Sequence, residues 1–335
     1  MRRLLRFCFF LLLCSCSMTV VKPEKINGIS FVASREPISD LHISPVVNLN
    51  ANFAAIMPFG FIRDLDQPVI YYNSDRQWFG ETISGAGQYI ESLQNNNIKI
   101  MLKPQIWVSH GDYTGHIEMN SEENWNALEN SYSEFILEYA DLAEQMNVDI
   151  FCIGTELEKF IENRPMYWED LIKKIKSVYK GKLTYAANWD EFKRTSFWNS
   201  LDYIGVDAYF PVSDSQTPTI EECKSGWQKH KMSIESVSRS FNKPVIFTEF
   251  GYRSVDYAGK EPWKSDRSMD QVNLNAQTNT TKALFEVFWH EEWFAGGFVW
   301  KWFSNYERSG GLDNSQFTPQ NKPVEAVIKD VFLNY

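Results

Sequence analysis

Two glutamates that end apolar runs are the residues best suited to chemistry in this sequence. Glu156 closes the run Ile153-Gly-Thr-Glu, and Glu249 closes the run Ile246-Phe-Thr-Glu. A carboxylate at the end of a buried strand loses hydration, which costs free energy unless the group is hydrogen-bonded or takes part in a reaction. Two such groups facing one ligand can act as nucleophile and as general acid/base. Retaining glycosidases need such a pair, about 5–5.5 Å apart.

The segments that must position these glutamates alternate between apolar β-rich runs and amphipathic, helix-like stretches. Eight runs that are apolar on both faces, with helices between them, are typical of a parallel sheet covered by helices. The count of eight favours an α/β fold of one (β/α)8 barrel over residues 26–335, rather than an open doubly wound sheet. The predicted strands are Ile26–Val32, Phe53–Pro58, Ile98–Pro104, Asp149–Glu156, Leu183–Asn188, Tyr203–Tyr209, Val245–Glu249 and Gly296–Trp300. The predicted helices include Glu123–Met146, Tyr167–Tyr179, Glu221–Phe241 and Gln271–Glu292, and the weakest is Ile38–Leu49, which Pro45 interrupts.

Polar and aromatic residues gather where these strands end. In a (β/α)8 barrel the carboxyl ends of the strands form the face that carries active sites. Glu156 and Glu249 end the fourth and seventh strands, which face each other across the barrel mouth. Salt bridges that close the rim would explain either glutamate alone. The pair, surrounded by aromatic residues, favours a catalytic site.

Further residues at the strand ends could assist such a pair. Tyr209 ends the sixth strand and could donate a hydrogen bond that keeps Glu249 ionised, although a tyrosine here could also pack on a helix. Trp300 ends the eighth strand and could form an apolar floor for a sugar ring. Its neighbour Trp302 is either a second platform or part of the core.

Charged and aromatic residues on the same rim have two interpretations each. Lys103 and Asp207 could bind sugar hydroxyls, but a mutual or neighbouring salt bridge explains them equally well. Glu158 is most simply a carboxylate of a loop or helix start. The remaining candidates are aromatic residues that could stack on pyranose rings or simply pack: Trp78, Trp107 and Trp189.

Short motifs add a resemblance to a known enzyme family. They are Leu-Lys-Pro at 102–104, Gly-Thr-Glu at 154–156, Ala-Asn-Trp at 187–189, Asp-Ala-Tyr at 207–209 and Glu-Phe-Gly-Tyr-Arg-Ser at 249–254. With glutamates ending the fourth and seventh strands, nearly the whole mature chain resembles the clan A glycoside hydrolases. Within that clan it looks like glycoside hydrolase family 113, which is known for cleaving β-1,4-mannan with retention.

The resemblance implies a role for each glutamate: Glu156 maps to the acid/base and Glu249 to the nucleophile. Most clan members place Asn directly before the acid/base, where it holds the sugar 2-hydroxyl. This chain has Thr155 there, so Asn188 on the next strand is a candidate for that contact. The implied activity is cleavage of internal β-1,4 linkages in a mannan-type polysaccharide. The alternatives are a clan A glucanase or other β-glycanase, and a non-catalytic surface glycan-binding lipoprotein.

The N-terminal segment predicts a bacterial lipoprotein. Three arginines precede the apolar run Phe7–Leu13, which is too short to span a bilayer as a mature helix. Cys16 follows a small residue and is the better lipidation candidate, because Leu13 precedes Cys14. We expect a cleaved leader over residues 1–15, a lipidated tether over 16–25 and anchoring to the cell envelope, at the outer membrane on its periplasmic or surface-facing side. An ordinary secretory signal with incidental cysteines is the alternative.

The composition narrows the partners further. The 335 residues are 44% hydrophobic and 15% aromatic, which is ample for one large core. The formal net charge of −10 makes nucleic acid and anionic membrane surfaces poor partners, so we expect membrane contact through the lipid alone. The histidines and cysteines lack zinc-site spacing and no Gly-rich phosphate loop occurs, so we expect no metal and no cofactor. We expect a monomer, with Cys152 as a small buried hydrophobe.

Overall fold

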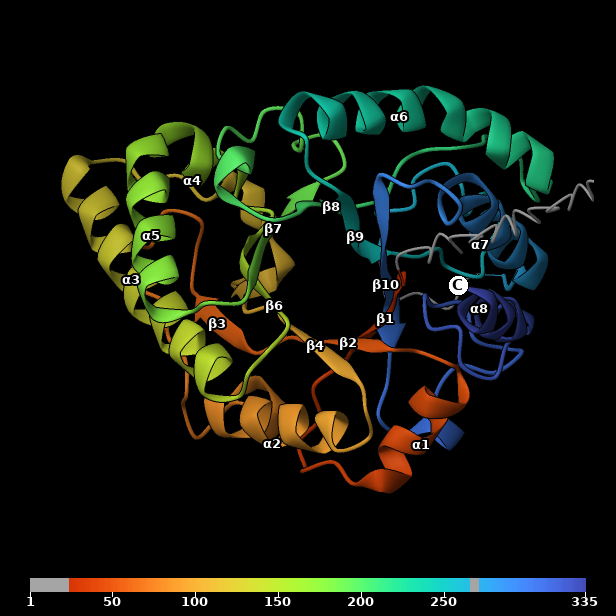
Figure 1. The fold of residues 1–335 in the computed structure, drawn as a ribbon, viewed down its shortest axis with the longest axis horizontal. Coiled ribbons are helices and arrows are strands. Elements are labelled where there is room, and N and C mark those ends of the chain that lie inside the picture. Colours follow the sequence, from red (N-terminus) through yellow and green to blue (C-terminus); the bar gives the residue numbers. More distant parts are fainter. Residues whose placement is uncertain (1–23, 266–270) are drawn as a thin grey trace, which may run out of the picture.

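The computed structural model describes residues 24–265 and 271–335, and its centre is a closed barrel of eight parallel strands (Figure 1). Successive barrel strands pair along the chain, and β10 pairs with β1, so the barrel has no free edge. The predicted (β/α)8 fold is confirmed, whereas the predicted leader, Cys16 and the tether up to residue 23 lie outside the described residues. The barrel strands are β1 (Ile26–Phe31), β2 (Phe53–Ile56), β4 (Lys99–Leu102), β6 (Ile150–Thr155), β7 (Lys182–Asn188), β8 (Ile204–Asp207), β9 (Val245–Phe250) and β10 (Phe294–Trp302).

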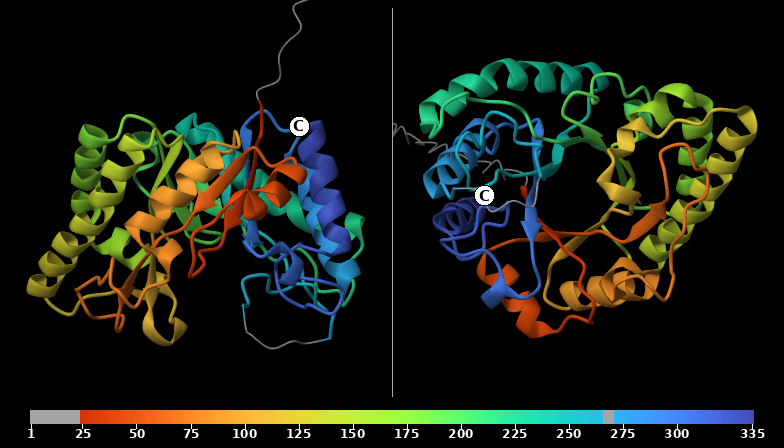
Figure 2. Two further views of the ribbon diagram at one scale, coloured as in Figure 1. Left: turned by 90° about the horizontal axis from the view of Figure 1, so that it is seen from below. Right: turned by 180° about the vertical axis from the view of Figure 1, so that it is seen from behind.

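Helices surround the barrel on its outside (Figures 1 and 2). The four clearest predicted helices correspond to α3, α5, α6 and α7, and the chain also forms a helix around Pro45, where the prediction was weakest. That helix, α1, persists because Ile43 and Val46 on its inner side are fully buried. Among the described residues, no helix is both long enough and apolar enough to span a membrane. The helices are α1 (Asp40–Asn48), α2 (Ile83–Gln94), α3 (Glu122–Gln145), α4 (Glu158–Asn163), α5 (Pro165–Val178), α6 (Ile220–Phe241), α7 (Leu274–Phe288) and α8 (Pro323–Asn334).

Two apolar layers explain why the strands are hydrophobic on both faces. One layer fills the barrel interior and includes Met101 and Ile246, while the other lies between strands and helices and includes Trp168 and Trp227. Cys152 is fully buried in the inner layer as a free thiol, which confirms the prediction for this residue. Burying a large apolar side chain contributes about 1.5–3 kcal/mol, so these layers hold the strand ends in fixed positions.

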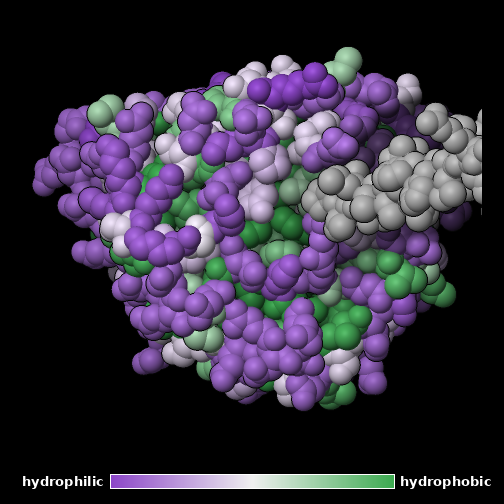
Figure 3. All heavy atoms as spheres, viewed as in Figure 1, coloured by the Kyte–Doolittle hydropathy of each residue, from purple (hydrophilic) through white to green (hydrophobic). Residues whose placement is uncertain are grey.

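The two ends of the barrel differ in character. The first described residues and the C-terminus lie at the end where the strands begin, and the long loops lie at the other end (Figure 2, left). Viewed from the end where the strands begin, the surface is mostly hydrophilic, with hydrophobic residues gathered near its centre (Figure 3).

The loops that follow β2 and β4 extend the barrel wall beyond its rim. Each loop contains a short strand, β3 (Phe59–Ile62) and β5 (Gln105–Val108), and the two pair in parallel as a separate small sheet. Alternate residues of a strand share a face, so Gln105 and Trp107 point to the same side of this sheet. Long loops also follow β9, with described residues 251–265 and 271–273, and β10, over residues 303–322. Short 3-10 turns lie at Phe79–Glu81, Ser109–Gly111, Thr114–His116, Trp198–Ser200 and Tyr306–Arg308.

Candidate active site

Glu249, on strand β9, lies at the centre of a cluster of hydrogen-bond donors. Its Oε1 accepts from Lys103 Nζ at 2.5 Å and from Gln105 Nε2 at 3.1 Å, and its Oε2 accepts from the Tyr209 hydroxyl at 2.7 Å. The side chain is almost fully buried, with 6% of its surface exposed. Charge-assisted hydrogen bonds stabilise a carboxylate more than a neutral acid, and bonds to both oxygens fix its orientation. This arrangement suits a nucleophile, and it includes the hydrogen bond predicted for Tyr209.

Lys103 and Asp207 are part of the support for Glu249 rather than a surface for sugar hydroxyls. Both are fully buried, and Lys103 Nζ lies 3.5 Å from Asp207 Oδ1, which also accepts from Thr248 Oγ1 at 2.7 Å. Burial and the nearby charge of Glu249 raise the pKa of Asp207 to about 7, and the ammonium of Lys103 opposes that rise. The salt-bridge alternative is therefore correct, and the expectation that these two residues bind sugar is wrong.

Glu156 follows the last residue of β6 and has a different environment. Its side chain lies at the barrel mouth, partly exposed but largely enclosed by protein. Burial, followed by repulsion from Asp207 and Glu249, raises the pKa of Glu156 well above its usual value. Within the described chain, no side chain donates a hydrogen bond to its carboxyl group. A carboxyl group held protonated in this way suits a general acid.

The backbone at Glu156 adopts a left-handed conformation, with φ of 50°. Three hydrogen bonds hold it: Glu156 N donates to Ala186 O at 2.8 Å, Leu157 N donates to the Tyr185 hydroxyl at 2.6 Å, and Thr114 Oγ1 donates to Glu156 O at 3.1 Å. A non-glycine residue in this region costs about 1–3 kcal/mol and persists when its surroundings fix it. These three hydrogen bonds thus fix the direction in which the Glu156 side chain leaves the backbone.

Asn188, at the end of β7, lies in the neighbourhood of Glu156. Its Nδ2 donates to the Tyr113 hydroxyl at 2.9 Å, and its Oδ1 accepts from Trp189 N at 2.9 Å. Burial and the nearby charge of Glu156 raise the pKa of Tyr113, and Thr114, the next residue, donates to Glu156 O at 3.1 Å. One N–H of Asn188 remains for a ligand, whereas the Thr155 hydroxyl is buried without a hydrogen-bond partner.

The predicted aromatic platforms divide into exposed and buried residues. Trp300 is half-buried, Trp107 is 45% exposed, and Trp78 is 43% exposed with the Arg35 guanidinium 5.3 Å from its ring centroid. Trp302 is fully buried, because β10 continues to this residue and its ring packs near Tyr306. Of the two alternatives for Trp302, the core is correct, and the expectation of a sugar contact is wrong.

An aromatic pair joins two loops of the active-site face. Trp189 stacks on Trp263 from the loop after β9, with ring centroids 5.2 Å apart and planes 17° apart, and its other contact is with Phe210. Trp263 is 41% exposed. The sequence analysis missed Trp263, Gln105 and the buried Glu191. The only sequence signal for Trp263 was an aromatic residue between the seventh predicted strand and the helix predicted after it.

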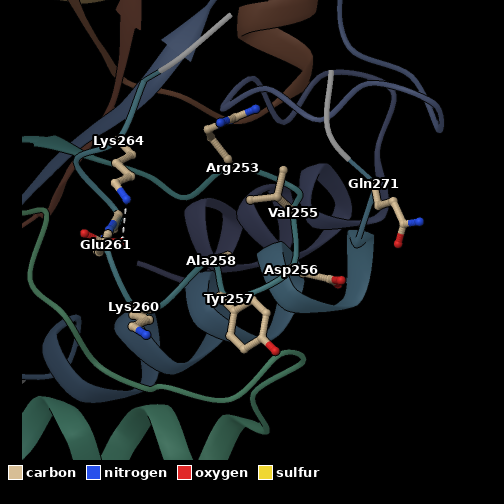
Figure 4. A pocket seen from close by; sticks show the side chains of 10 residues that line it. Arg253, Val255, Asp256, Tyr257, Ala258, Lys260, Glu261, Lys264 and Gln271 are labelled. Atoms are coloured by element: carbon tan, nitrogen blue, oxygen red, sulfur yellow. Dashed lines mark hydrogen bonds and ion pairs between the residues drawn. The ribbon is translucent and has the colours of Figure 1, made fainter. Parts of the chain in front are cut away.

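The same loop also lines an open pocket of about 450 Å³ (Figure 4). Neither Glu156 nor Glu249 lines it, although the loop begins directly after β9. Its lining is mixed in charge, and Lys264 donates to Glu261 at 2.6 Å across one side. Within residues 24–265 and 271–335, no cluster of three or more His, Cys, Asp or Glu side chains could hold a metal ion. The lining residues include Arg253, Val255, Asp256, Tyr257, Lys260 and Gln271.

Solved structures similar to this chain share its fold over almost its whole length. A structure described as a complex of a GH113 β-1,4-mannanase is 21% identical, with a TM-score of 0.81, covering 93% of this chain and 100% of that chain. The GH113 β-mannanase AaManA from Alicyclobacillus acidocaldarius, in complex with ManMIm, is 22% identical, with a TM-score of 0.79, covering 93% and 98%. Another GH113 β-1,4-mannanase is 20% identical, with a TM-score of 0.78, covering 93% and 100%.

The family follows from a different comparison. No curated protein matches the sequence. The family model described as Glycoside Hydrolase Family 113 matches residues 35–322, a range that contains both glutamates and every barrel strand after β1. Because this match covers most of the chain, the protein belongs to Glycoside Hydrolase Family 113 of clan A, and its barrel is that of a glycoside hydrolase.

Proposed function

We propose that the protein cleaves internal β-1,4 linkages of a mannan-type polysaccharide with retention of configuration. The observation that carries this proposal is the unequal environment of the two glutamates. Glu249 accepts three hydrogen bonds, one of them from a lysine, whereas burial and negative neighbours raise the pKa of Glu156. One group therefore suits a nucleophile and the other an acid, as double displacement requires.

The reaction has two steps. In the first, a carboxylate oxygen of Glu249 attacks the anomeric carbon while Glu156 gives its proton to the leaving glycosidic oxygen, which leaves as an alcohol. In the second, Glu156, now a carboxylate, takes a proton from water, and the resulting hydroxyl group bonds to the anomeric carbon. The bond to Glu249 breaks, and both glutamates return to their starting states.

Aromatic residues along the active-site face support a long sugar chain as substrate. Trp107 lies on the same face of β5 as Gln105, which binds the nucleophile, so an exposed indole continues outward from Glu249. Trp263 offers a second exposed ring on the far side of the mouth. Such rings stack on the C–H faces of pyranoses. The mannan assignment is supported by the similar solved structures, which are described as β-1,4-mannanases.

Hydrolysis assays test this function directly. The soluble domain and its Glu249→Gln variant are incubated with mannan, glucomannan, cellulose and xylan, and reducing ends are measured. Glu158→Gln is the matched control, because Glu158 begins α4 and forms an ion pair with Arg194. We expect products from mannan, with retained anomeric configuration by NMR, in wild type and Glu158→Gln alone.

Other outcomes select the alternatives. Preference for cellulose would identify a glucanase or another β-glycanase. Binding to a glycan without any product would identify a glycan-binding protein. Unchanged activity in Glu249→Gln would contradict the nucleophile assignment.

We also propose that the protein is an exported lipoprotein anchored to the cell envelope through Cys16. The support is the leader pattern, with a basic start, a short apolar run and a small residue before the cysteine. Cys16→Ala should release the full-length protein from membranes, with Cys14→Ala as the control that stays bound. Membrane association unchanged in Cys16→Ala would refute the anchor.

A further inference from the structure

We propose that Glu191 is a positioning residue for the acid/base Glu156, acting through the Tyr185 phenol and the peptide N–H of Leu157. This proposal rests on the proposed function, because it concerns the proton that Glu156 would transfer. The hydrogen bonds of Glu191 are to Tyr185 and Asn188, and none of them is to Glu249 or to the carboxyl group of Glu156. Its role is to hold the direction of another side chain.

A continuous set of hydrogen bonds links Glu191 to the acid. Glu191 lies in the loop directly after β7 and is only 2% exposed. Its Oε1 accepts from the Tyr185 hydroxyl at 2.8 Å, and the same hydroxyl accepts from Leu157 N at 2.6 Å. Leu157 is the residue after Glu156, so this N–H belongs to the peptide unit that leaves the strained position.

The phenol explains why an acceptor is required at Glu191. A tyrosine hydroxyl carries one proton and offers lone pairs as acceptors. Because the Tyr185 hydroxyl donates its hydrogen bond to Glu191, its lone pairs remain available to the N–H of Leu157. Without an acceptor oxygen at Glu191, the hydroxyl could rotate and turn its proton toward that N–H. The left-handed backbone of Glu156 would then lose one of its three fixed contacts.

The second oxygen of Glu191 reaches the acid by another route. Glu191 Oε2 accepts from Asn188 N at 3.0 Å, and the Asn188 side chain donates to the Tyr113 hydroxyl at 2.9 Å. Tyr113 directly precedes Thr114, whose Oγ1 donates to Glu156 O at 3.1 Å. Both oxygens of Glu191 therefore accept hydrogen bonds from residues of β7, Tyr185 and Asn188, whose other partners lie beside Glu156.

The cost of burying Glu191 supports a dedicated role. Burial is the largest influence on this group and raises its pKa to about 8, and the charges of Asp207 and Asp190 add to that rise. The hydrogen bonds from Asn188 and Tyr185 offset only part of the effect. A buried carboxyl group beside other acids is costly, and such groups concentrate at functional sites.

The experiment separates acid positioning from general support of the fold. The variants are Glu191→Gln, whose amide offers one oxygen in place of two, and Tyr185→Phe, which removes the phenol. Asp202→Asn is the matched control, because Asp202 also accepts a backbone N–H, from Leu183 at 2.9 Å, at the opposite end of β7. Each protein is assayed on mannan and on 2,4-dinitrophenyl β-mannobioside, and thermal unfolding is recorded.

The two substrates differ in their need for an acid. Dinitrophenolate leaves without protonation, so bond cleavage in this substrate does not depend on the proton of Glu156. For Glu191→Gln and Tyr185→Phe we expect kcat/KM on mannan to fall about 10- to 100-fold, the size of effect that misplacing a catalytic group produces. On the dinitrophenyl substrate kcat/KM should stay within about 3-fold, while kcat and KM fall together because the second step still needs Glu156 as base. Asp202→Asn should act as wild type on both substrates.

Each other result overturns the proposal. Equal losses of kcat/KM on both substrates would mean that Glu191 supports the fold and not the acid, and unchanged activity on mannan would mean that it supports neither. Wild-type protein inactive on every glycan and on the dinitrophenyl substrate would instead overturn the proposed function itself. If Glu191→Gln fails to fold, Tyr185→Phe gives the same test through the middle of the hydrogen-bonded set.

Discussion

Glu249 and Glu156 each follow a threonine at the end of an apolar strand, yet the protein surrounds them differently. Glu249 accepts hydrogen bonds from Lys103, Gln105 and Tyr209. Glu156 accepts none from the side chains that the structure describes, and burial together with the negative charges near it raises its pKa. Equivalent sequence patterns can thus produce one carboxyl group surrounded by hydrogen-bond donors and another whose pKa is raised by its surroundings. The distribution of donors, and not the local sequence, separates the two roles.

Removing Glu249 should have the largest effect. We expect Glu249→Ala to lower kcat on mannan by about 10⁴-fold or more, the size of loss that follows removal of a nucleophile. Added azide can enter the vacated space and attack the anomeric carbon directly, which gives a glycosyl azide of inverted configuration. NMR of the product measures this, and a product of retained configuration would exchange the roles of the two glutamates.

Removing Glu156 should have the next largest effect and a different signature. Glu156→Ala should lower kcat/KM on mannan by about 10²- to 10⁴-fold, the contribution of a general acid. Azide should here give a glycosyl azide of retained configuration, because the intermediate on Glu249 still forms.

The pH dependence should change in the same variant. Because burial and nearby negative charge raise the pKa of Glu156, wild-type kcat/KM on mannan should persist above the pH range in which a glutamate usually titrates, and fall as pH rises through the raised pKa. Glu156→Ala should lack this alkaline fall in its residual kcat/KM on mannan. An alkaline fall that survives the substitution would assign it to another group.

A substitution at Tyr209 should reduce the difference in hydrogen bonding between Glu249 and Glu156. Tyr209→Phe removes one of three donors to Glu249, and a hydrogen bond to a charged group contributes about 1.5–3 kcal/mol. We expect kcat/KM to fall about 10- to 100-fold on mannan and on the dinitrophenyl substrate alike, because the nucleophile serves both. A loss confined to mannan would place Tyr209 with the acid instead.

The smallest effect concerns the outer part of the site. Trp263→Ala removes one ring of the stacked pair with Trp189, and an aromatic contact of this kind contributes about 0.5–1.5 kcal/mol. We expect KM for mannan to rise about 2- to 10-fold with kcat little changed. Leu312→Ala, at an exposed position in the loop after β10, is the control. An equal fall in kcat for both variants would argue against a platform at Trp263.

The parts of the molecule that could be predicted are those with local causes. Apolar runs of strand length identify the barrel, and the two glutamates stand out because an acid rarely follows such a run. The roles of Lys103 and Asp207 were harder to predict. Only a contact between residues 104 positions apart shows that each compensates the other's buried charge. Gln105 and Glu191 gave no signal, since their partners come from other strands. The burial of Trp302 depended on whether β10 stopped at residue 300 or continued.

The position of β1 has a consequence for how the enzyme would meet its substrate. The first described residues enter the barrel at the end where the strands begin, opposite the catalytic mouth (Figure 2). If Cys16 carries lipid, a tether over residues 16–25 reaches at most about 30–35 Å from the bilayer. The body of the barrel would then stand between the membrane and the mouth. The barrel mouth would face away from the bilayer, so polymers too large to approach a lipid surface could still be cut.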